Sequence, residues 1–136
     1  MLKDQVSPFA VLRLLSPAAV SDNTAQVSQI IDTQLYASVG IAIATGSLAD
    51  ADATFDVKLD EGDAANLSDA AEVTAAAKLL GTKEDFDFSD DNATFFFGYR
   101  GDKRYIRLTI TPSGNASAAN LAAVAICEKR KVGDTL

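Results

Sequence analysis

The chain has 136 residues, 48% of them apolar, and a formal net charge of −7 at pH 7. These values predict one folded domain with its own core and speak against a disordered chain. The absence of histidine removes the commonest general base and transition-metal ligand, and a single cysteine excludes an internal disulfide framework. Cys127 lies in an apolar run, so we expect a buried, unreactive thiol. No apolar run approaches the length of a membrane span, and no secretory signal is visible.

Four strands are predicted in the first half of the chain. Each is a short apolar or alternating run bounded by turn residues. They cover residues 9–15, 27–31, 36–45 and 53–60. Pro8 and Pro17 flank the first strand and place it at a sheet edge, because proline cannot donate to a ladder. That strand alternates little, so it is either covered on both faces or added to the sheet edge of a neighbouring subunit.

One segment favours a helix instead. Asp69 and Glu72 have capping-box spacing, and the apolar residues Val73, Ala76, Ala77 and Leu80 follow at helical intervals. With glycine 81 as a stop signal, the pattern predicts one short helix or helical turn.

The second half returns to strands. Phe86 and Phe88 resume a period of two, and 95–99 and 105–111 alternate clearly on either side of Gly101 and Asp102. We expect the latter two strands to form a hairpin, with Gly101 supplying the turn. The run 119–127 suits a helix by its alanines and a buried strand by its length. About eight strands with frequent turn signals predict an all-β sandwich or barrel.

Charge is unevenly distributed. Residues 50–91 contain thirteen acidic and three basic residues, whereas residues 98–136 contain seven basic and three acidic ones. This separation either orients the protein against a charged partner or reflects uneven surface loops. The overall acidity speaks against a general nucleic-acid binder.

Three groups of residues are candidates for a function. The acidic residues 85, 87, 90 and 91 are hard oxygen ligands that suit calcium, but without EF-hand spacing a solvated acidic surface explains them better. The expected turn is surrounded by four basic residues, Arg100, Lys103, Arg104 and Arg107. Three alternatives are open for them: solvated surface charges, contact with an acidic protein surface, or contact with nucleic-acid phosphates. Phe96 points away from the core side of its strand, so it marks either an interface or a sheet covered on both faces.

The segment Gly-Tyr-Arg-Gly-Asp-Lys-Arg-Tyr-Ile-Arg-Leu-Thr-Ile-Thr-Pro, residues 98–112, resembles the small capsid cement, or decoration, proteins of tailed bacteriophages. Shorter landmarks in the same order are Ile31-Asp32-Thr33, Ala53-Thr54-Phe55, Leu80-Gly81-Thr82 and Asp91-Asn92. The residues before Pro17 and the basic tail 129–131 match least well.

This resemblance implies a jelly-roll-like antiparallel β-sandwich and favours a strand at 119–127. It implies a non-enzymatic protein of the virion that binds the outer surface of the capsid and bridges major capsid protein subunits, with no cofactor, catalytic residue, metal, nucleic acid or membrane. We expect a homodimer, with residues 1–17 as a partner-contacting strand or arm and 18–136 as the sandwich domain. The candidate interface residues are Phe9, Val11, Leu12, Arg13, Leu14, Phe96, Arg100, Lys103, Arg104 and Arg107. The alternative function is a carbohydrate-binding β-sandwich module, because jelly rolls also host lectins.

Overall fold

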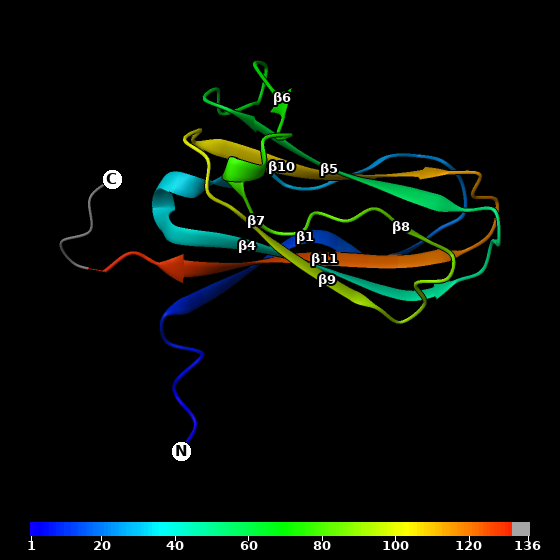
Figure 1. Cartoon of the computed structure of the whole chain (residues 1–136), viewed down its shortest axis with the longest axis horizontal. Helices are drawn as coiled ribbons and strands as arrows, with labels where there is room; N and C mark the ends of the chain where they lie inside the picture. The colour runs from blue at the N-terminus through cyan, green and yellow to red at the C-terminus, as the bar shows by residue number, and fades with distance from the viewer. Residues whose placement is uncertain (132–136) are drawn as a thin grey trace.

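The structure is a computed structural model that describes residues 1–131. Within that range the chain forms two antiparallel sheets packed face to face (Figure 1). Sheet A has the order β1-β11-β4-β9-β7 and sheet B the order β2-β10-β5-β6, with β3 also paired to β10 and β8 to β5. The strands are β1 Phe9–Val20, β2 Gln26–Val27, β3 Ile31–Asp32, β4 Tyr36–Leu48, β5 Thr54–Gly62, β6 Ala71–Glu72, β7 Leu79–Gly81, β8 Phe86–Asp87, β9 Thr94–Tyr99, β10 Tyr105–Ser113 and β11 Ala119–Lys129.

The strand order confirms the predicted jelly-roll-like sandwich. Counting β2 with β3 as one broken strand, β1-β11-β4-β9 faces β2/β3-β10-β5-β8, and the chain crosses between the sheets at almost every connection. Two four-stranded antiparallel sheets connected in this way define a jelly roll. The ambiguous run 119–127 is therefore a strand, and it lies near the centre of sheet A between β1 and β4.

The core lies between the sheets and follows the predicted alternation. Ile106, Leu108 and Ile110 of β10 are at most 1% exposed, and Ile41 and Ile43 of β4 face them from sheet A with the same degree of burial. The rings of Phe55, Phe86 and Phe95, from β5, β8 and β9, stack in series with centroids 4.8 and 5.2 Å apart. These rings close one end of the sandwich.

The predicted hairpin is wrong. β9 pairs with β4 and β7 in sheet A, whereas β10 pairs with β2, β3 and β5 in sheet B. Residues 100–104 therefore cross from one sheet to the other. Gly101 does not have a positive φ, and its need for glycine is steric, since a Cβ there would lie 2.3 Å from the hydroxyl oxygen of Tyr99.

The segment 69–81 contains a helical turn in place of a longer helix. Ala76–Lys78 forms one 3-10 turn, and a second such turn occurs at Thr33–Leu35. The capping-box residues Asp69 and Glu72 do not cap the turn at Ala76–Lys78. The carboxylate of Asp69 accepts hydrogen bonds from the backbone N–H of Asp63 and Ala64, and Glu72 belongs to β6, which pairs with β5. The open edge of β5 offers backbone partners, and this tertiary pairing overrides local helix preference.

The first strand lies at the edge of sheet A, as its prolines predict. β1 runs through Pro17 to Val20 and pairs with β11 of the same chain, with register shifts on both sides of Leu15. Residues 1–7 are exposed and run away from the sandwich on the side of sheet A (Figure 1). We refer to residues 1–8 as the N-terminal arm. Its contact with a partner stays a prediction.

Candidate functional site

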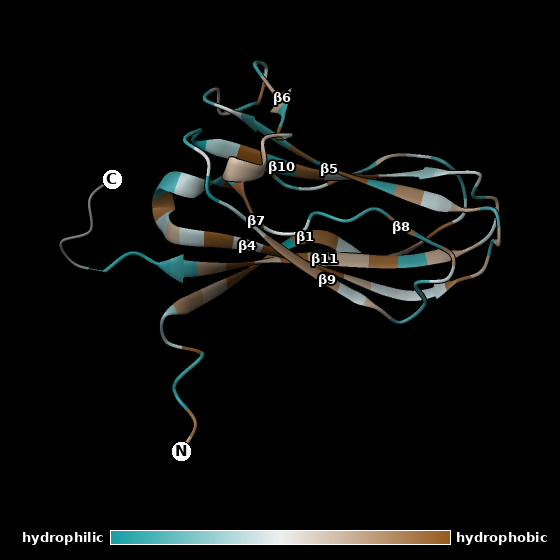
Figure 2. Cartoon of the chain, in the orientation of Figure 1, coloured by the Kyte–Doolittle hydropathy of each residue, from teal (hydrophilic) through white to brown (hydrophobic). Residues whose placement is uncertain are grey.

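The outward surface of sheet A is apolar across all five strands. Cross-strand register aligns Val11, Ile126, Gly40, Gly98 and Leu80 in one row, and neighbouring rows continue it. In Figure 2 the ribbons of β1, β9 and β11 are mostly brown and white, with teal at the arrowhead of β11. We call this surface the outer apolar face; its principal residues are Val11, Gly40, Ala42, Ala44, Leu80, Phe96, Ala122, Val124 and Ile126.

Phe96 is the largest side chain of the outer apolar face. It is 62% exposed, and its ring crosses Gly40 of the neighbouring strand, where a Cβ would lie 2.8 Å from two ring atoms. Leu80 covers Gly98 in the same way, at 3.3 Å from a notional Cβ. The two glycines therefore let large apolar side chains lie flat on the sheet.

Small side chains hollow the other half of this face. A depression of about 110 Å³ is lined by Ala42, Ala44, Thr94, Ala122 and Val124 together with the backbone neighbours of these residues. A second hollow of about 400 Å³ adjoins it around Gly46, Asn120 and the 17–19 stretch of β1. The outer apolar face thus carries two large exposed side chains, Phe96 and Leu80, together with hollows lined by small residues.

Charged groups are confined to the rim of the outer apolar face. Arg13 lies on the edge strand opposite Val124 and hydrogen-bonds through its guanidinium to the hydroxyl of Ser16. Glu128 lies at the end of β11, where Ser38 donates a weak 3.5 Å hydrogen bond to its carboxylate. An apolar centre with a polar rim is the usual anatomy of a protein interface.

The basic residues around the β9–β10 connection are largely engaged within the chain. Arg104 makes a two-pronged ion pair with Asp32, with N···O distances of 3.0 and 2.9 Å, and Lys103 pairs with Asp63 at 3.2 Å. The Arg104 guanidinium also lies 5.1 Å from the centroid of the Tyr105 ring. Donation of hydrogen bonds by Arg104 lowers the pKa of the Asp32 carboxyl. These contacts hold the crossing between the sheets.

A buried polar network also holds the connection between β9 and β10. The hydroxyl of Tyr99 donates to Glu61 at 2.7 Å, and the ammonium of Lys78 donates to the other oxygen of that carboxylate. The backbone N–H of Lys103 donates to the Tyr99 hydroxyl at 3.1 Å. Burial, followed by the hydrogen bond to Glu61, raises the pKa of Tyr99, and the hydrogen bond to Glu61 raises the pKa of Lys78.

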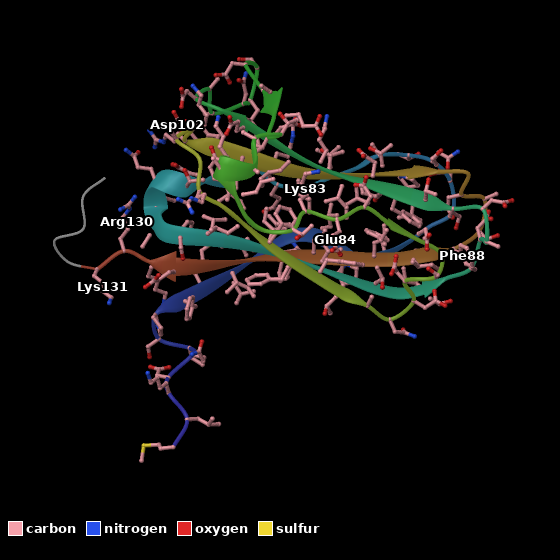
Figure 3. The ribbon with its side chains drawn as sticks, viewed as in Figure 1. Lys83, Glu84, Phe88, Asp102, Arg130 and Lys131 are labelled. Atoms are coloured by element: carbon pink, nitrogen blue, oxygen red, sulfur yellow. The ribbon has the colours of Figure 1, made fainter. Side chains whose placement is uncertain are left out.

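Arg100 and Arg107 differ from their two neighbours. Arg100 is exposed, and its backbone N–H donates to the carbonyl of Lys78 at 2.9 Å. Arg107 points outward from β10 beside Asp60 of β5, and its Nε is buried without a hydrogen-bond partner among residues 1–131. The four basic residues therefore do not form one free patch. Figure 3 places Asp102 at the end of the sandwich where β10 begins.

The acidic residues after position 84 act as backbone caps. Asp85 accepts from the N–H of Val57, Asp91 from that of Leu48 and Asp90 from that of Asp87, all between 2.7 and 3.0 Å. The ammonium of Lys83, on the segment that runs along the open side of the layers (Figure 3), donates to the carbonyl of Val57. Within residues 1–131 no cluster of three metal-ligating side chains is found, and no helix is long and apolar enough to cross a membrane.

The candidate interface residues from the sequence separate into three groups. Phe9, Val11, Arg13 and Phe96 point outward from sheet A, and the last three lie on or at the rim of the outer apolar face. Leu14 is 3% exposed and, with the half-buried Leu12, faces the core. The four basic residues lie at the end of the sandwich and on sheet B.

Sequence reasoning missed most of the outer apolar face. Ala42, Ala44, Ala122, Val124 and Ile126 were not among the candidates, although they occupy the outward positions of β4 and β11. The sequence did carry one indication: both the inward and the outward residues of these strands are apolar. This pattern is typical of strands that are covered on both faces. Cys127, on the inward set of β11, is fully buried, as expected, and burial raises its pKa to about 11.

No protein-family model and no curated protein matches this sequence. Among solved structures, the chain is similar to the CBM32 of AlyQ in complex with 4,5-unsaturated mannuronic acid, with 16% identity, TM-score 0.40, and coverage of 86% of this chain and 97% of that one. A truncated AlyQ with CBM32 and alginate lyase domains has 16% identity and TM-score 0.44; the match covers 93% of this chain and 35% of that one.

The C-terminal family 22 carbohydrate binding module of Clostridium thermocellum Xyn10B has 7% identity and TM-score 0.43, with 97% and 90% of the two chains covered. β-Sandwiches host many unrelated functions, so the fold alone does not assign one to this chain.

Proposed function

We propose that the chain is a non-enzymatic binding protein that attaches to another protein through the outer apolar face. The exposed, contiguous apolar surface around Phe96 carries this proposal. Soluble proteins seldom leave a whole sheet face of this kind in water, and such patches mark sites of association. The five paired strands beneath it make the surface rigid, so little conformational entropy is lost on docking.

The specific form of the proposal is a cement protein on the outer surface of a tailed-phage head, with the major capsid protein as its partner. The resemblance of residues 98–112 supports it. Within that segment, Lys103 and Arg104 pair with Asp63 and Asp32 and hold the crossing between the sheets. Binding only to the assembled shell stabilises the shell by mass action.

The N-terminal arm supplies a second contact in this proposal. Met1, Leu2 and Val6 are 81% exposed or more, and Asp4 caps the turn before β1 by accepting from the N–H of Val6 and Ser7. A rigid face plus an extended arm lets one molecule touch two neighbouring subunits. The second contact then forms at high effective concentration, so each can be weak.

The second candidate is a carbohydrate-binding module. One observation favours it: a hollow of about 320 Å³ beside β5 and β8 is lined by Asp56, Asp85, Asp87, Asp90 and the Thr54 hydroxyl, groups that accept hydrogen bonds from sugar hydroxyls. Against it, the aromatic residues of this hollow, Phe55 and Phe86, are at most 4% exposed and stacked in the core. They offer no platform for a sugar ring.

Co-sedimentation tests the two candidates together. The purified protein is added to phage heads that lack it, and separately to a panel of oligosaccharides that includes mannuronate oligomers. We expect saturable binding to heads, a higher temperature of head disruption and no retention by the glycans. Glycan binding that is lost on replacing Asp56 and Asp85 by alanine, together with no binding to heads, would overturn the proposal in favour of the second candidate.

A further inference from the structure

We infer that the open edge of β1 pairs with an extended, predominantly apolar segment of the partner protein, which adds one strand to sheet A. This inference rests on the proposed function, and it names the form in which the partner binds at this edge. Its basis is a set of backbone N–H and C=O groups within Phe9–Arg13 that point away from β11.

One hydrogen bond shows which backbone groups of β1 point toward β11. The carbonyl of Pro8 accepts from the N–H of Lys129 at 2.7 Å, as in the hydrogen-bonded pairs of an antiparallel ladder. Because such pairs alternate with pairs that are not hydrogen-bonded, every second residue after Pro8 also bonds to β11. The backbone groups of Val11 and Arg13 therefore point to the opposite side, which is the open edge of sheet A.

The rest of the described chain leaves these groups uncovered. Within residues 1–131, the N–H and C=O of Val11 and the N–H of Arg13 have no hydrogen-bond partner on the open side. The N-terminal arm does not cover them, because the carbonyl of Val6 accepts from the N–H of Phe9 at 3.3 Å and the arm then runs away from the sandwich (Figure 1). The open backbone groups are therefore accessible to another chain.

The second half of β1 is closed to pairing. The register with β11 shifts on both sides of Leu15, and the carbonyl of Leu14 accepts from the N–H of Gln29 at 3.4 Å. Pro17 has no N–H to offer. Bulges and prolines are features with which proteins prevent strand pairing at a sheet edge. The open segment Phe9–Arg13 ends where these features begin, and it has about the usual length of a strand.

The edge of sheet B along β5 is blocked by the chain itself. Between β6 and β8, Asp85 accepts from the N–H of Val57 at 2.8 Å and the ammonium of Lys83 donates to its carbonyl at 2.6 Å. The carbonyl of Leu59 accepts from the N–H of Val73 at 2.7 Å. An unblocked edge is a template for pairing with another chain. The contrast with β5 singles out the first half of β1 as the edge available to a partner.

The side chains beside the open edge define the chemistry of the added strand. Because side chains alternate along a strand, those of the added strand would lie beside Val11 on the outer apolar face and beside Leu12 at the border of the core. Val11 is 67% exposed and Leu12 is half-buried, so both would gain cover. The one charge of the open segment, Arg13, is directed to the hydroxyl of Ser16. An apolar strand fits these neighbours, and main-chain hydrogen bonds supply the affinity in this mode of binding.

Amide hydrogen exchange tests the inference on the full-length protein, free and bound to phage heads that lack it. In the free protein the amides of Val11 and Arg13 should exchange rapidly, whereas those of Ala10 and Leu12, which bond to β11, should be protected. On the heads, exchange at Val11 and Arg13 should slow at least about tenfold, equivalent to about 1.4 kcal/mol.

Two substitutions at one position separate the backbone from the side chain. Val11→Ala and Val11→Pro both remove the valine side chain, but only proline also removes the N–H that points to the open edge. Proline is accepted in edge strands whose N–H faces solvent, so both variants should keep the wild-type circular dichroism. Val11→Pro should bind heads at least about tenfold more weakly than Val11→Ala. Ala10→Pro removes a bond to β11 instead and should unfold at a lower urea concentration.

The outcomes separate this inference from the proposed function. Binding to heads with unchanged exchange at Val11 and Arg13, or with equal affinity for Val11→Ala and Val11→Pro, overturns the added strand and leaves the proposed function in place. Protection of both amides in the free protein that is lost on dilution means that a second copy covers the edge, which also contradicts the inference. Failure of the wild type to bind heads overturns the proposed function and, with it, this inference. The exchange measurement on the wild type does not depend on the folding of any variant.

Discussion

The two outward surfaces of this sandwich are built on the same period of two, yet they differ in chemistry. Outward positions of β4 and β11 hold alanine, valine, isoleucine and glycine, whereas those of β5 and β10 hold Asp56, Lys58, Arg107 and Thr111. On sheet B the charges pair within the chain, as Lys58 does with Asp60 at 3.5 Å. The charges of sheet B are satisfied by water and by pairs within the chain. The difference supports our proposal that sheet A contacts a partner protein.

The largest expected effect is a difference in the free energy of unfolding between substitutions on the two faces of β9. Phe97 and Phe96 are adjacent in β9, but Phe97 is 2% exposed and Phe96 is 62% exposed. Phe97→Ala should lower the free energy of unfolding by about 3–5 kcal/mol through lost burial and a cavity. Phe96→Ala should cost less than about 1 kcal/mol, because most of its ring is exposed.

Urea unfolding of the purified variants measures both losses. Equal losses for Phe96→Ala and Phe97→Ala would show that the ring of Phe96 belongs to the core, contrary to the comparison.

The next effect concerns the network beneath the β9–β10 crossing. Tyr99→Phe removes the hydrogen bond to Glu61 and leaves that buried carboxylate with Lys78 alone. We expect a loss of about 1–3 kcal/mol in the free energy of unfolding, the usual range for a hydrogen bond to a charged group. Tyr105→Phe removes a hydroxyl from the outward side of sheet B and should change stability by less than about 0.5 kcal/mol. Indistinguishable unfolding midpoints for the two variants would refute this role of Tyr99.

A smaller effect on the free energy of unfolding should appear at acidic pH. Hydrogen bonds from Arg104 lower the folded-state pKa of Asp32, so the pair contributes stability above the unfolded pKa of about 3.9 and loses it as the pH falls through the lower folded value. The contribution should be about 0.5–1 kcal/mol, because the pair is partly solvated. In urea unfolding between pH 7 and 2.5, Asp32→Asn should remove this part of the pH dependence. An unchanged pH profile in that variant would exclude the pair as its source.

The smallest effect concerns Cys127, on the inward side of β11. Burial raises the pKa of its thiol to about 11, so its contribution to stability is present below the unfolded value of about 8.5 and declines as the pH rises through 11. At pH 8 a disulfide reagent should label the native protein only at the rate of unfolding, and label it at once in urea. Rapid labelling of the native protein would show that β11 opens.

Strand positions were predictable from the sequence, but strand partners were not. The alternation of Ile106, Leu108 and Ile110 directly indicates one buried face. It carries no information on whether β9 and β10 pair, and in a jelly roll these consecutive strands lie in opposite sheets. The predicted helical segment is limited to the turn Ala76–Lys78 for a related reason, because Glu72 pairs with Asp60 of β5, which is distant in sequence.

The candidate site was predictable only in part. Phe96 and Val11 are large apolar residues at outward positions, and both were predicted as interface residues. The alanines of β4 and β11 signal nothing by themselves, because small apolar residues suit helices, strands and cores equally. Their meaning depends on register: only when Ala42, Val124 and Phe96 lie side by side do they form a surface.

The claim that sheet A is the contact surface is tested most directly by head binding of the matched lysine variants. Binding isotherms to phage heads lacking the protein should be compared for the wild type, Ala42→Lys and Thr111→Lys, after circular dichroism has confirmed that each is folded. We predict at least tenfold weaker binding for Ala42→Lys, equivalent to about 1.4 kcal/mol, and unchanged binding for Thr111→Lys. Loss of binding in Thr111→Lys with full binding in Ala42→Lys would place the contact on sheet B and contradict the account.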